Sequence, residues 1–171
     1  MINSRRVKKV KIPSSPEEAY RSALKTAMNI VGYKDNTEKT LSKKLLERGY
    51  ERETVKAVLE FMKEKGYIND GRMLIRTARS LALTKLYGKA RIKNELVLKQ
   101  FSSEILSSLD WDDEELSDID FVEICLKLIK RRGGARDEKT YAYLKRYGHS
   151  SSDIKRAYAI YQAESEEYEE E

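Results

Sequence analysis

The sequence predicts an all-α protein of three tandem three-helix, helix-turn-helix-like repeats that form an elongated curved array. A pattern of leucine, turn and helix recurs three times, at steps of about 50 residues, a period that is typical of stacked helical repeats. The turn residues of the three copies are Tyr50, Phe101 and His149. Only two prolines and eight glycines interrupt the 171 residues, so long stretches are free to be helical. Such arrays present long surfaces to elongated partners, and we therefore expect a binding function.

The repeat pattern divides the chain into six segments. These are a basic N-terminal arm at 1–15, repeats at 16–67, 68–111 and 120–163, an acidic linker at 112–119 and an acidic tail at 164–171. A leucine precedes each turn residue by five positions, and we expect these three leucines, Leu45, Leu96 and Leu144, to lie in the core. Ile92 is expected there as well.

The first repeat is predicted to begin with a helix after the cap residue Ser15. Pro16 follows, and proline is tolerated in a first turn because its missing N–H would have no partner there. Gly32 ends this helix, and either Asn36 or Thr37 caps the next. The three predicted helices cover 16–31, 37–48 and 51–65.

The second and third repeats follow the same plan, with Gly88 expected to permit a tight helix junction. Gln100 stands where Gly49 and Gly148 stand in the other two turns, so the second turn is expected to differ slightly. Trp111 is interpreted as a packing residue, with a partner contact as the alternative. The predicted helices cover 70–87, 90–100 and 103–109 in the second repeat and 120–132, 139–147 and 152–162 in the third.

The sequence contains no set of residues typical of a catalytic or metal site. One cysteine and one histidine cannot form a zinc site of the usual kind, and no phosphate-binding glycine loop is present. Cys125 lies in an apolar run and is expected as a buried small hydrophobe, whereas His149 is expected as a solvent-facing turn residue. We therefore expect no enzyme, no cofactor and no metal. Without a membrane-length apolar run or a disulfide framework, the expected location is cytoplasmic.

Charge is unevenly distributed and favours an anionic partner. The net charge is +5, yet acidic side chains concentrate at 110–120 and 164–171, so the rest of the chain is much more basic than the total. Residues 1–12 hold five basic residues and no acid, and this arm either lies on phosphates or is solvated. The acidic tail shields a basic surface in one hypothesis and only solubilises the protein in the other.

Basic side chains on predicted helix faces are the candidate binding residues. Arg72, Arg76 and Arg79 recur at steps of four and three, which places them on one face of a helix. Arginine and lysine at this density suit a phosphate backbone, with solvated helix faces as the alternative for any one residue. Four tyrosines lie among these charges and either stack on bases or pack against the core. They are Tyr87, Tyr141, Tyr143 and Tyr147.

Short motifs follow one another in a fixed order through the first and second repeats. The string has a Gly-Tyr-Ile-Asn-Asp turn, an arginine-bearing helix, a glycine, an Arg-Ile pair and a Glu-Leu before a turn. It comprises Gly66–Arg72, Arg79, Tyr87–Ile92, Glu95-Leu96 and the earlier Lys44–Tyr50. This string resembles that of the RecX family of recombinase regulators, and the resemblance covers about 17–162. It departs from the family at Met73-Leu74, where an aromatic-alanine pair is usual, and at Gln100, where glycine is usual.

The resemblance implies a negative regulator of the RecA recombinase in DNA repair, homologous recombination and the SOS response. It implies a protein that lodges along the RecA filament on single-stranded DNA and restrains ATPase, strand exchange and co-protease activity. We expect a monomer that also binds DNA weakly by itself. The alternatives are a RecA-independent nucleic-acid-binding helical repeat protein and a scaffold for an acidic protein. The expected contact residues are Lys43, Lys44, Arg48, Arg72, Arg79, Lys89, Arg91, Lys93, Arg131, Arg132 and Arg136.

Overall fold

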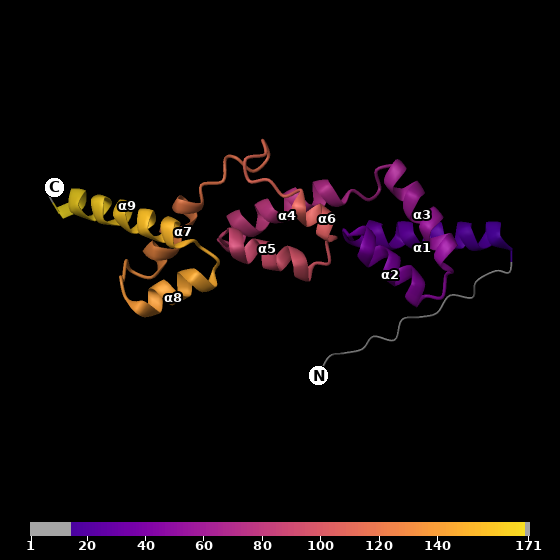
Figure 1. The fold of residues 1–171 in the computed structure, drawn as a ribbon, viewed down its shortest axis with the longest axis horizontal. Coiled ribbons are helices and arrows are strands. Elements are labelled where there is room, and N and C mark those ends of the chain that lie inside the picture. The colour runs from indigo at the N-terminus through magenta and orange to yellow at the C-terminus, as the bar shows by residue number, and fades with distance from the viewer. Residues whose placement is uncertain (1–14, 170–171) are drawn as a thin grey trace. The chain divides into compact units, whose positions relative to one another are not determined.

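A computed structural model describes residues 15–169, and over that range the fold is all-helical, as the sequence predicts (Figure 1). Residues 1–14 of the predicted basic arm and residues 170–171 of the predicted tail lie outside the described part. The helices within it are α1 (Pro16–Tyr33), α2 (Glu38–Glu47), α3 (Arg52–Glu64), α4 (Asp70–Lys85), α5 (Lys89–Leu98), α6 (Ser103–Ser107), α7 (Phe121–Arg131), α8 (Glu138–Arg146) and α9 (Ser151–Glu169).

Most helix ends lie where the sequence predicts them, but Gly32 does not end α1, which continues through it to Tyr33. Thr37, rather than Asn36, caps α2, because its hydroxyl accepts a hydrogen bond from the Thr40 backbone N–H at 3.1 Å. Asp120 caps α7 in the same way, through the N–H groups of the next turn. The last helix, α9, continues to Glu169, past the predicted end of the third repeat at residue 163.

The chain forms two compact units. Unit 1 is Met1–Met73 with Gln100–Ser102, and unit 2 is Leu74–Lys99 with Ser103–Glu171. Unit 1 is built by α1, α2 and α3, whose apolar faces meet in a core around the fully buried Leu41 and Leu45. The buried Tyr50 joins the α2–α3 turn to α1, since its hydroxyl lies 2.9 Å from Ser22 Oγ and 2.8 Å from Thr26 Oγ1.

In unit 2 the dominant pairing is α7 against α9, which lie side by side in Figure 1. Burial of Ile92, Leu96 and Leu144 confirms their predicted place in the core. Cys125 is likewise fully buried, and burial raises the pKa of its thiol to about 12. The thiol is therefore a packing group, as predicted, and is protonated at neutral pH.

The three repeated turns each contain one left-handed residue. The residue before the turn aromatic or histidine has positive φ in each copy: 98° at Gly49, 64° at Gln100 and 91° at Gly148. The second turn nevertheless differs slightly, as expected. Gln100 has a smaller φ than either glycine, and the hydrogen bonds from the Tyr50 and His149 N–H groups to the Leu45 and Leu144 carbonyls have no counterpart at Phe101 among the described residues. Gln100 is left-handed despite its side chain, which strains the backbone locally.

His149 is buried, with 1% of its surface exposed, and the prediction of a solvent-facing side chain is wrong. The repeat pattern already aligns it with Tyr50 and Phe101, and both of these turn residues are buried too. Its Nε2 lies 3.1 Å from the Leu86 carbonyl oxygen, so Nε2 carries the proton and donates it. His149 is buried because of its position in the repeated turn, although its side chain is polar.

Two glycines meet where the second repeat joins the third within unit 2. The Gly88 N–H donates to the Tyr147 carbonyl at 2.9 Å, and the Ala90 N–H donates to the Gly148 carbonyl at 3.3 Å. A Cβ added at Gly88 would lie 2.6 Å from the His149 backbone nitrogen and closer still to the Gly148 carbonyl. The backbone of the third repeat, rather than the predicted junction between consecutive helices, therefore requires glycine at position 88, and the contact also depends on a second glycine.

Among residues 15–169, no helix is both long enough and apolar enough to cross a membrane.

Candidate functional site

The eleven predicted contact residues divide between the two units. Unit 1 holds Lys43, Lys44, Arg48 and Arg72, and unit 2 holds the rest. All of them are exposed or half-buried, as a binding role requires. Within each unit, however, the structure gives most of them a partner, and these partners determine what each cation can do.

Arg79 is bound to the acidic linker. Its Nη2 donates to Asp118 Oδ2 at 2.6 Å, Nη1 donates to the other oxygen of the same carboxylate, and Nη1 also donates to the Glu115 carbonyl at 2.8 Å. The guanidinium lowers the pKa of Asp118, and the carboxylate raises that of Arg79. Such a bidentate pair ties α4 to the predicted linker, where Leu116 and Ile119 are buried.

Lys89 lies at the start of α5 over two aromatic rings. Its Nζ is 5.6 Å from the centre of the Trp111 ring and 5.2 Å from that of Phe121, within cation–π range. The two rings meet edge to face, 5.1 Å apart. Trp111 therefore packs against Phe121, as interpreted. It also contacts Lys89, which lines a groove.

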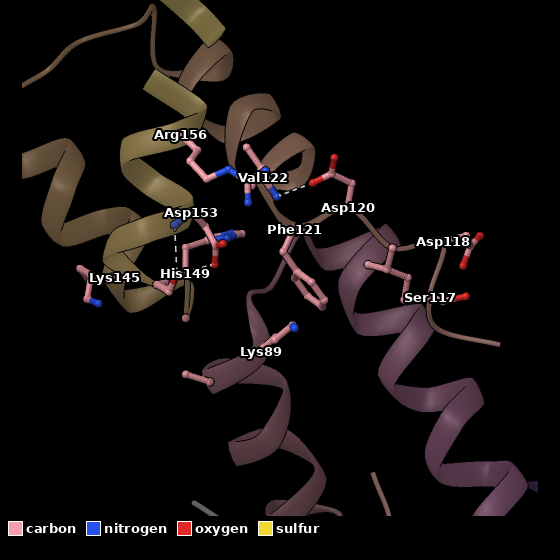
Figure 2. A pocket seen from close by; sticks show the side chains of 14 residues that line it. Lys89, Ser117, Asp118, Asp120, Phe121, Val122, Lys145, His149, Asp153 and Arg156 are labelled. Carbon is pink, nitrogen blue, oxygen red and sulfur yellow. Dashed lines mark hydrogen bonds between the residues drawn. The ribbon is translucent and has the colours of Figure 1, made fainter. Parts of the chain in front are cut away.

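That groove has a volume of 810 Å³ and is the one drawn in Figure 2. Its basic lining residues are Lys89, Lys145 and Arg156. The acids beside them already serve the fold: Asp120 caps α7, and Asp153 accepts hydrogen bonds from the Ser150 N–H and hydroxyl. Burial lowers the pKa of His149, which also lines the groove, and the ring is therefore neutral near pH 7.

The Nδ1 atom of His149 is buried without a hydrogen-bond partner among the described residues. With the proton on Nε2, Nδ1 is an acceptor. A buried, unpaired acceptor is unusual, and its desolvation contributes to the lowered pKa.

Arginines and tyrosines stack together beside the paired glycines, and we call this group the arginine–tyrosine cluster. Tyr143 and Tyr147 lie 4.5 Å apart between ring centres, and Tyr147 meets Tyr87 edge to face at 5.5 Å. Guanidinium groups lie over the rings at 4.9–5.7 Å. The cluster comprises Tyr87, Arg91, Arg132, Tyr143, Arg146 and Tyr147.

The cluster presents half-buried rings and partly exposed cations. Arg91 also pairs with Glu95, one turn away, at 2.8 Å, whereas Arg132 donates to the Thr140 hydroxyl at 3.1 Å. Burial, and then Tyr147, raise the pKa of Tyr143, so its hydroxyl remains a neutral donor over the physiological range. Neutral hydroxyls beside guanidinium donors suit an anionic polymer such as a phosphate backbone.

The remaining predicted contacts in unit 2 are more open. Lys93 and Arg131 are exposed, and neither has an ion pair among the described residues. Arg136 lies over the Tyr158 ring at 5.7 Å. Of the predicted contacts in unit 2, Lys93 and Arg131 thus have the most freedom to meet a partner.

In unit 1 the structure brings Lys44 and Arg48 together with a third cation, Lys34, around a groove of 620 Å³. Burial lowers the pKa of Lys44, and the neighbouring charges of Arg48 and Lys34 lower it further. Lys34 and the exposed Tyr33 beside it are not among the contact residues predicted from the sequence. Spacing along the sequence does not reveal how α1 packs against α2. No sequence signal therefore indicates that Tyr33 and Lys34 share a groove with Lys44 and Arg48.

No group of three or more histidine, cysteine or acidic side chains among the described residues is arranged to hold a metal ion.

Comparison with known proteins places this geometry in context. The family model of the RecX first three-helix domain matches residues 23–62, which lie in α1–α3. A regulatory protein RecX of Clostridium perfringens (strain SM101 / Type A) is 28% identical over 120 residues, 68% of this chain and 56% of that protein. The chain therefore spans little more than half the length of this relative. A regulatory protein RecX of Pelodictyon phaeoclathratiforme is 27% identical over 124 residues, 72% of this chain and 74% of that protein.

Two solved structures share the fold. A crystal structure of RecX from Lactobacillus salivarius matches with a TM-score of 0.65 at 20% identity, over 81% of this chain and 93% of that one. A crystal structure of a regulatory protein RecX matches with a TM-score of 0.63 at 21% identity, over 82% of this chain and 73% of that one. The resemblance to the RecX family that the sequence predicts is therefore confirmed, in sequence and in fold.

Proposed function

We propose that this protein is a negative regulator of the RecA recombinase that binds the RecA filament on single-stranded DNA. The observation that carries the proposal is the match of residues 23–62 to the family model of the RecX first three-helix domain, supported by the relatives named regulatory protein RecX. Binding restrains the ATPase, strand-exchange and co-protease activities of the filament. The protein does this by stoichiometric contact and performs no chemistry of its own.

The arginine–tyrosine cluster supports a partner that carries phosphate. Guanidinium groups stacked on rings lose little freedom on binding and keep donors directed outward, which reduces the entropy cost of contact. Lys93 and Arg131 add exposed charge in the same unit. We propose that these groups, with Lys89, Arg91 and the other predicted cations, contact the filament.

Arg79 differs from the exposed, unpaired cations Lys93 and Arg131 because an acid already binds it. Its charge is already neutralised by Asp118, so a filament contact would have to replace a bidentate pair. Charge reversal at Arg79 would also place an acid against Asp118 and disturb the linker. Substitutions at unpaired cations are therefore the cleaner test.

A Lys93→Glu/Arg131→Glu double variant is expected to need on the order of tenfold more protein for half-maximal inhibition of RecA ATPase. The reason is that each substitution turns an attraction for phosphate or acidic surface into a repulsion. Lys56→Glu, an exposed lysine of α3 outside the predicted set, is the matched control and should inhibit like the parent protein. Full inhibition by a folded double variant would remove this surface from the proposal.

The alternative function is nucleic-acid binding that needs no RecA, and the same stacked cluster favours it. A control with DNA alone separates the two. Inhibition at protein concentrations too low to coat the DNA supports filament regulation, whereas inhibition that follows DNA saturation supports competition for DNA.

A further inference from the structure

The groove of unit 1 concentrates positive charge. Lys34, Lys44 and Arg48 line it, and Glu47 is the one acid among its lining residues. Glu47 has a partner of its own, since Lys43 Nζ lies 4.0 Å from its Oε1. Three cations within one groove repel one another, and an anionic ligand would relieve that repulsion.

Two of these cations are fixed in place by neutral groups. Lys44 Nζ donates to Asn36 Oδ1, and Arg48 Nη1 donates to the Lys44 carbonyl at 2.8 Å. The Asn36 side chain is anchored in turn, because its Nδ2 donates to the Ile30 carbonyl at 3.4 Å. These bonds orient the two side chains without neutralising them, and Glu47 is the one carboxylate of the lining that acts on Lys44. Fixed cations in excess over acids are the arrangement of a preorganised anion site.

Tyr33 lies at the edge of the same groove with 92% of its surface exposed. It is the last residue of α1, and at this exposure its ring is open to a planar group as far as the described residues are concerned. An exposed ring beside fixed cations is the pattern by which proteins hold a single-stranded nucleic acid, with phosphate on the cations and a base on the ring. The volume of 620 Å³ lies in the range of small-ligand sites.

Helix dipoles act against an anion here, because α1 and α2 both end near the groove. The partial charge at a helix C-terminus is about half of one negative charge. The three full positive charges of Lys34, Lys44 and Arg48 outweigh the partial charges of both helix ends.

We propose that this groove binds one nucleotide of a single-stranded nucleic acid, with its phosphate on Lys34, Lys44 and Arg48 and its base stacked on Tyr33. This binding goes beyond regulation of RecA, since it involves unit 1 alone and requires no filament. DNA and RNA share the chemistry that the groove recognises. An acidic protein segment lacks the base and would leave Tyr33 unused.

The affinity test uses the full chain, without RecA, and a fluorescein-labelled oligo-dT followed by anisotropy. Tyr33→Ala is expected to weaken binding about 5- to 100-fold, and Tyr33→Phe to preserve it. Tyr67→Ala removes a half-exposed tyrosine elsewhere in unit 1 and should change nothing. Lys34→Gln should lower the slope of log affinity against log salt by about 0.7. Unchanged binding by both Tyr33→Ala and Lys34→Gln would overturn the proposal.

Two further probes separate base, sugar and protein. An abasic oligonucleotide keeps the phosphates, so wild type should bind it as weakly as Tyr33→Ala binds oligo-dT. Oligo-rU should bind like oligo-dT if phosphate and base are the recognised groups. Stronger displacement by poly-glutamate than by oligo-dT would overturn the proposal in favour of an acidic protein partner.

Photocrosslinking locates the base directly. A 5-iodouracil oligonucleotide crosslinks to rings on which it stacks, and the expected crosslinked peptide contains Tyr33. Crosslinks confined to the tyrosines of unit 2 would overturn the proposal even if the chain binds DNA. Neither outcome depends on RecA, so failure here leaves the proposed regulation of RecA standing.

Discussion

At the scale of single residues, the junction of Gly88 and Gly148 is the feature most sensitive to change. Each glycine faces backbone of the other repeat: a Cβ on Gly148 would lie 2.9 Å from Arg91 Cα and closer still to the Arg91 nitrogen. Backbone atoms held by two hydrogen bonds cannot move aside as a flexible side chain can. Contact between second and third repeats therefore depends on the absence of two side chains.

Gly88→Ala is accordingly expected to lower the free energy of unfolding of unit 2 by about 1–3 kcal/mol. Urea denaturation followed by circular dichroism measures the change. Gly32→Ala is the matched control, because a Cβ there meets nothing within 4 Å and alanine is the better helix former, worth about 0.5–1 kcal/mol. Equal stability of the Gly88→Ala variant and the parent would contradict the described junction.

His149 makes the stability of unit 2 depend on pH. Burial lowers its pKa below the ordinary 6.5, so between these values the unfolded chain binds a proton that the folded chain does not. The free energy of unfolding should therefore fall as pH drops from about 6.5 toward the lower, folded-state pKa, by at most about 1.4 kcal/mol per pH unit. Above pH 7.5 this contribution should be constant.

The measurement is a series of urea titrations between pH 7.5 and 5.5. Because His149 is the one histidine of the sequence, a His149→Gln variant isolates its contribution. Gln keeps a donor for the Leu86 carbonyl and does not titrate. The same pH slope in variant and parent would show that other groups cause it.

At the scale of elements, the turns show how the repeat is encoded. Leu45, Leu96 and Leu144 are all fully buried, and the residue before each turn aromatic or histidine is left-handed. Gln100 achieves this at a cost of roughly 1–2 kcal/mol in backbone strain, which glycine would not incur. Glycine at this position would lower the free energy of unfolding by about 0.5–1 kcal/mol, because its unfolded state is freer. Relief of strain and this entropy cost therefore have opposite signs.

Gln100→Gly is therefore expected to stabilise the protein by up to about 1 kcal/mol. Gly66→Ala provides the reverse experiment, since Gly66 has a φ of 72° and its Cβ would meet nothing within 4 Å. That variant should be less stable by about the same amount. Thermal unfolding of both decides the matter, and destabilisation by Gln100→Gly would show that the glutamine side chain makes a contact worth more than the strain.

Local patterns in the sequence were enough to predict the helices, but not what the turns and cations touch. Pro16 and Asp120 mark helix starts by short-range chemistry, and leucine spacing identifies the core. Ser15 takes the predicted N-cap position, but its side chain makes no capping hydrogen bond. His149 was placed wrongly because polarity was weighed above its position in the repeat. The meeting of Gly88 with Gly148 and the pairing of Arg79 with Asp118 join residues far apart in sequence, and no local pattern reveals them.

The sequence predicts the kind of partner that the candidate site suits, but not how its side chains are arranged. A density of arginine and lysine on helix faces indicated an anionic partner, and the stacked guanidinium groups over Tyr87 and Tyr143 are consistent with that. The open question over the tyrosines has a mixed answer. Tyr87, Tyr143 and Tyr147 pack against one another, whereas Tyr141 is exposed.

At the scale of the whole molecule, the central claim is that binding itself is the function. The described residues offer two basic surfaces, one in each unit, and no metal-binding cluster. A stoichiometric regulator needs only complementary surface, and its action should weaken with salt because charge supplies much of the attraction. The acidic segment 164–171 reduces this attraction at one point, because Glu164 pairs with Lys130 at 2.7 Å.

The most direct test is RecA ATPase on single-stranded DNA, with this protein titrated in at two salt concentrations and a DNA-only binding control alongside. Our account predicts loss of ATPase at protein levels too low to coat the DNA, with a weaker effect at the higher salt. Unchanged ATPase at concentrations where the control shows DNA binding would contradict regulation of RecA.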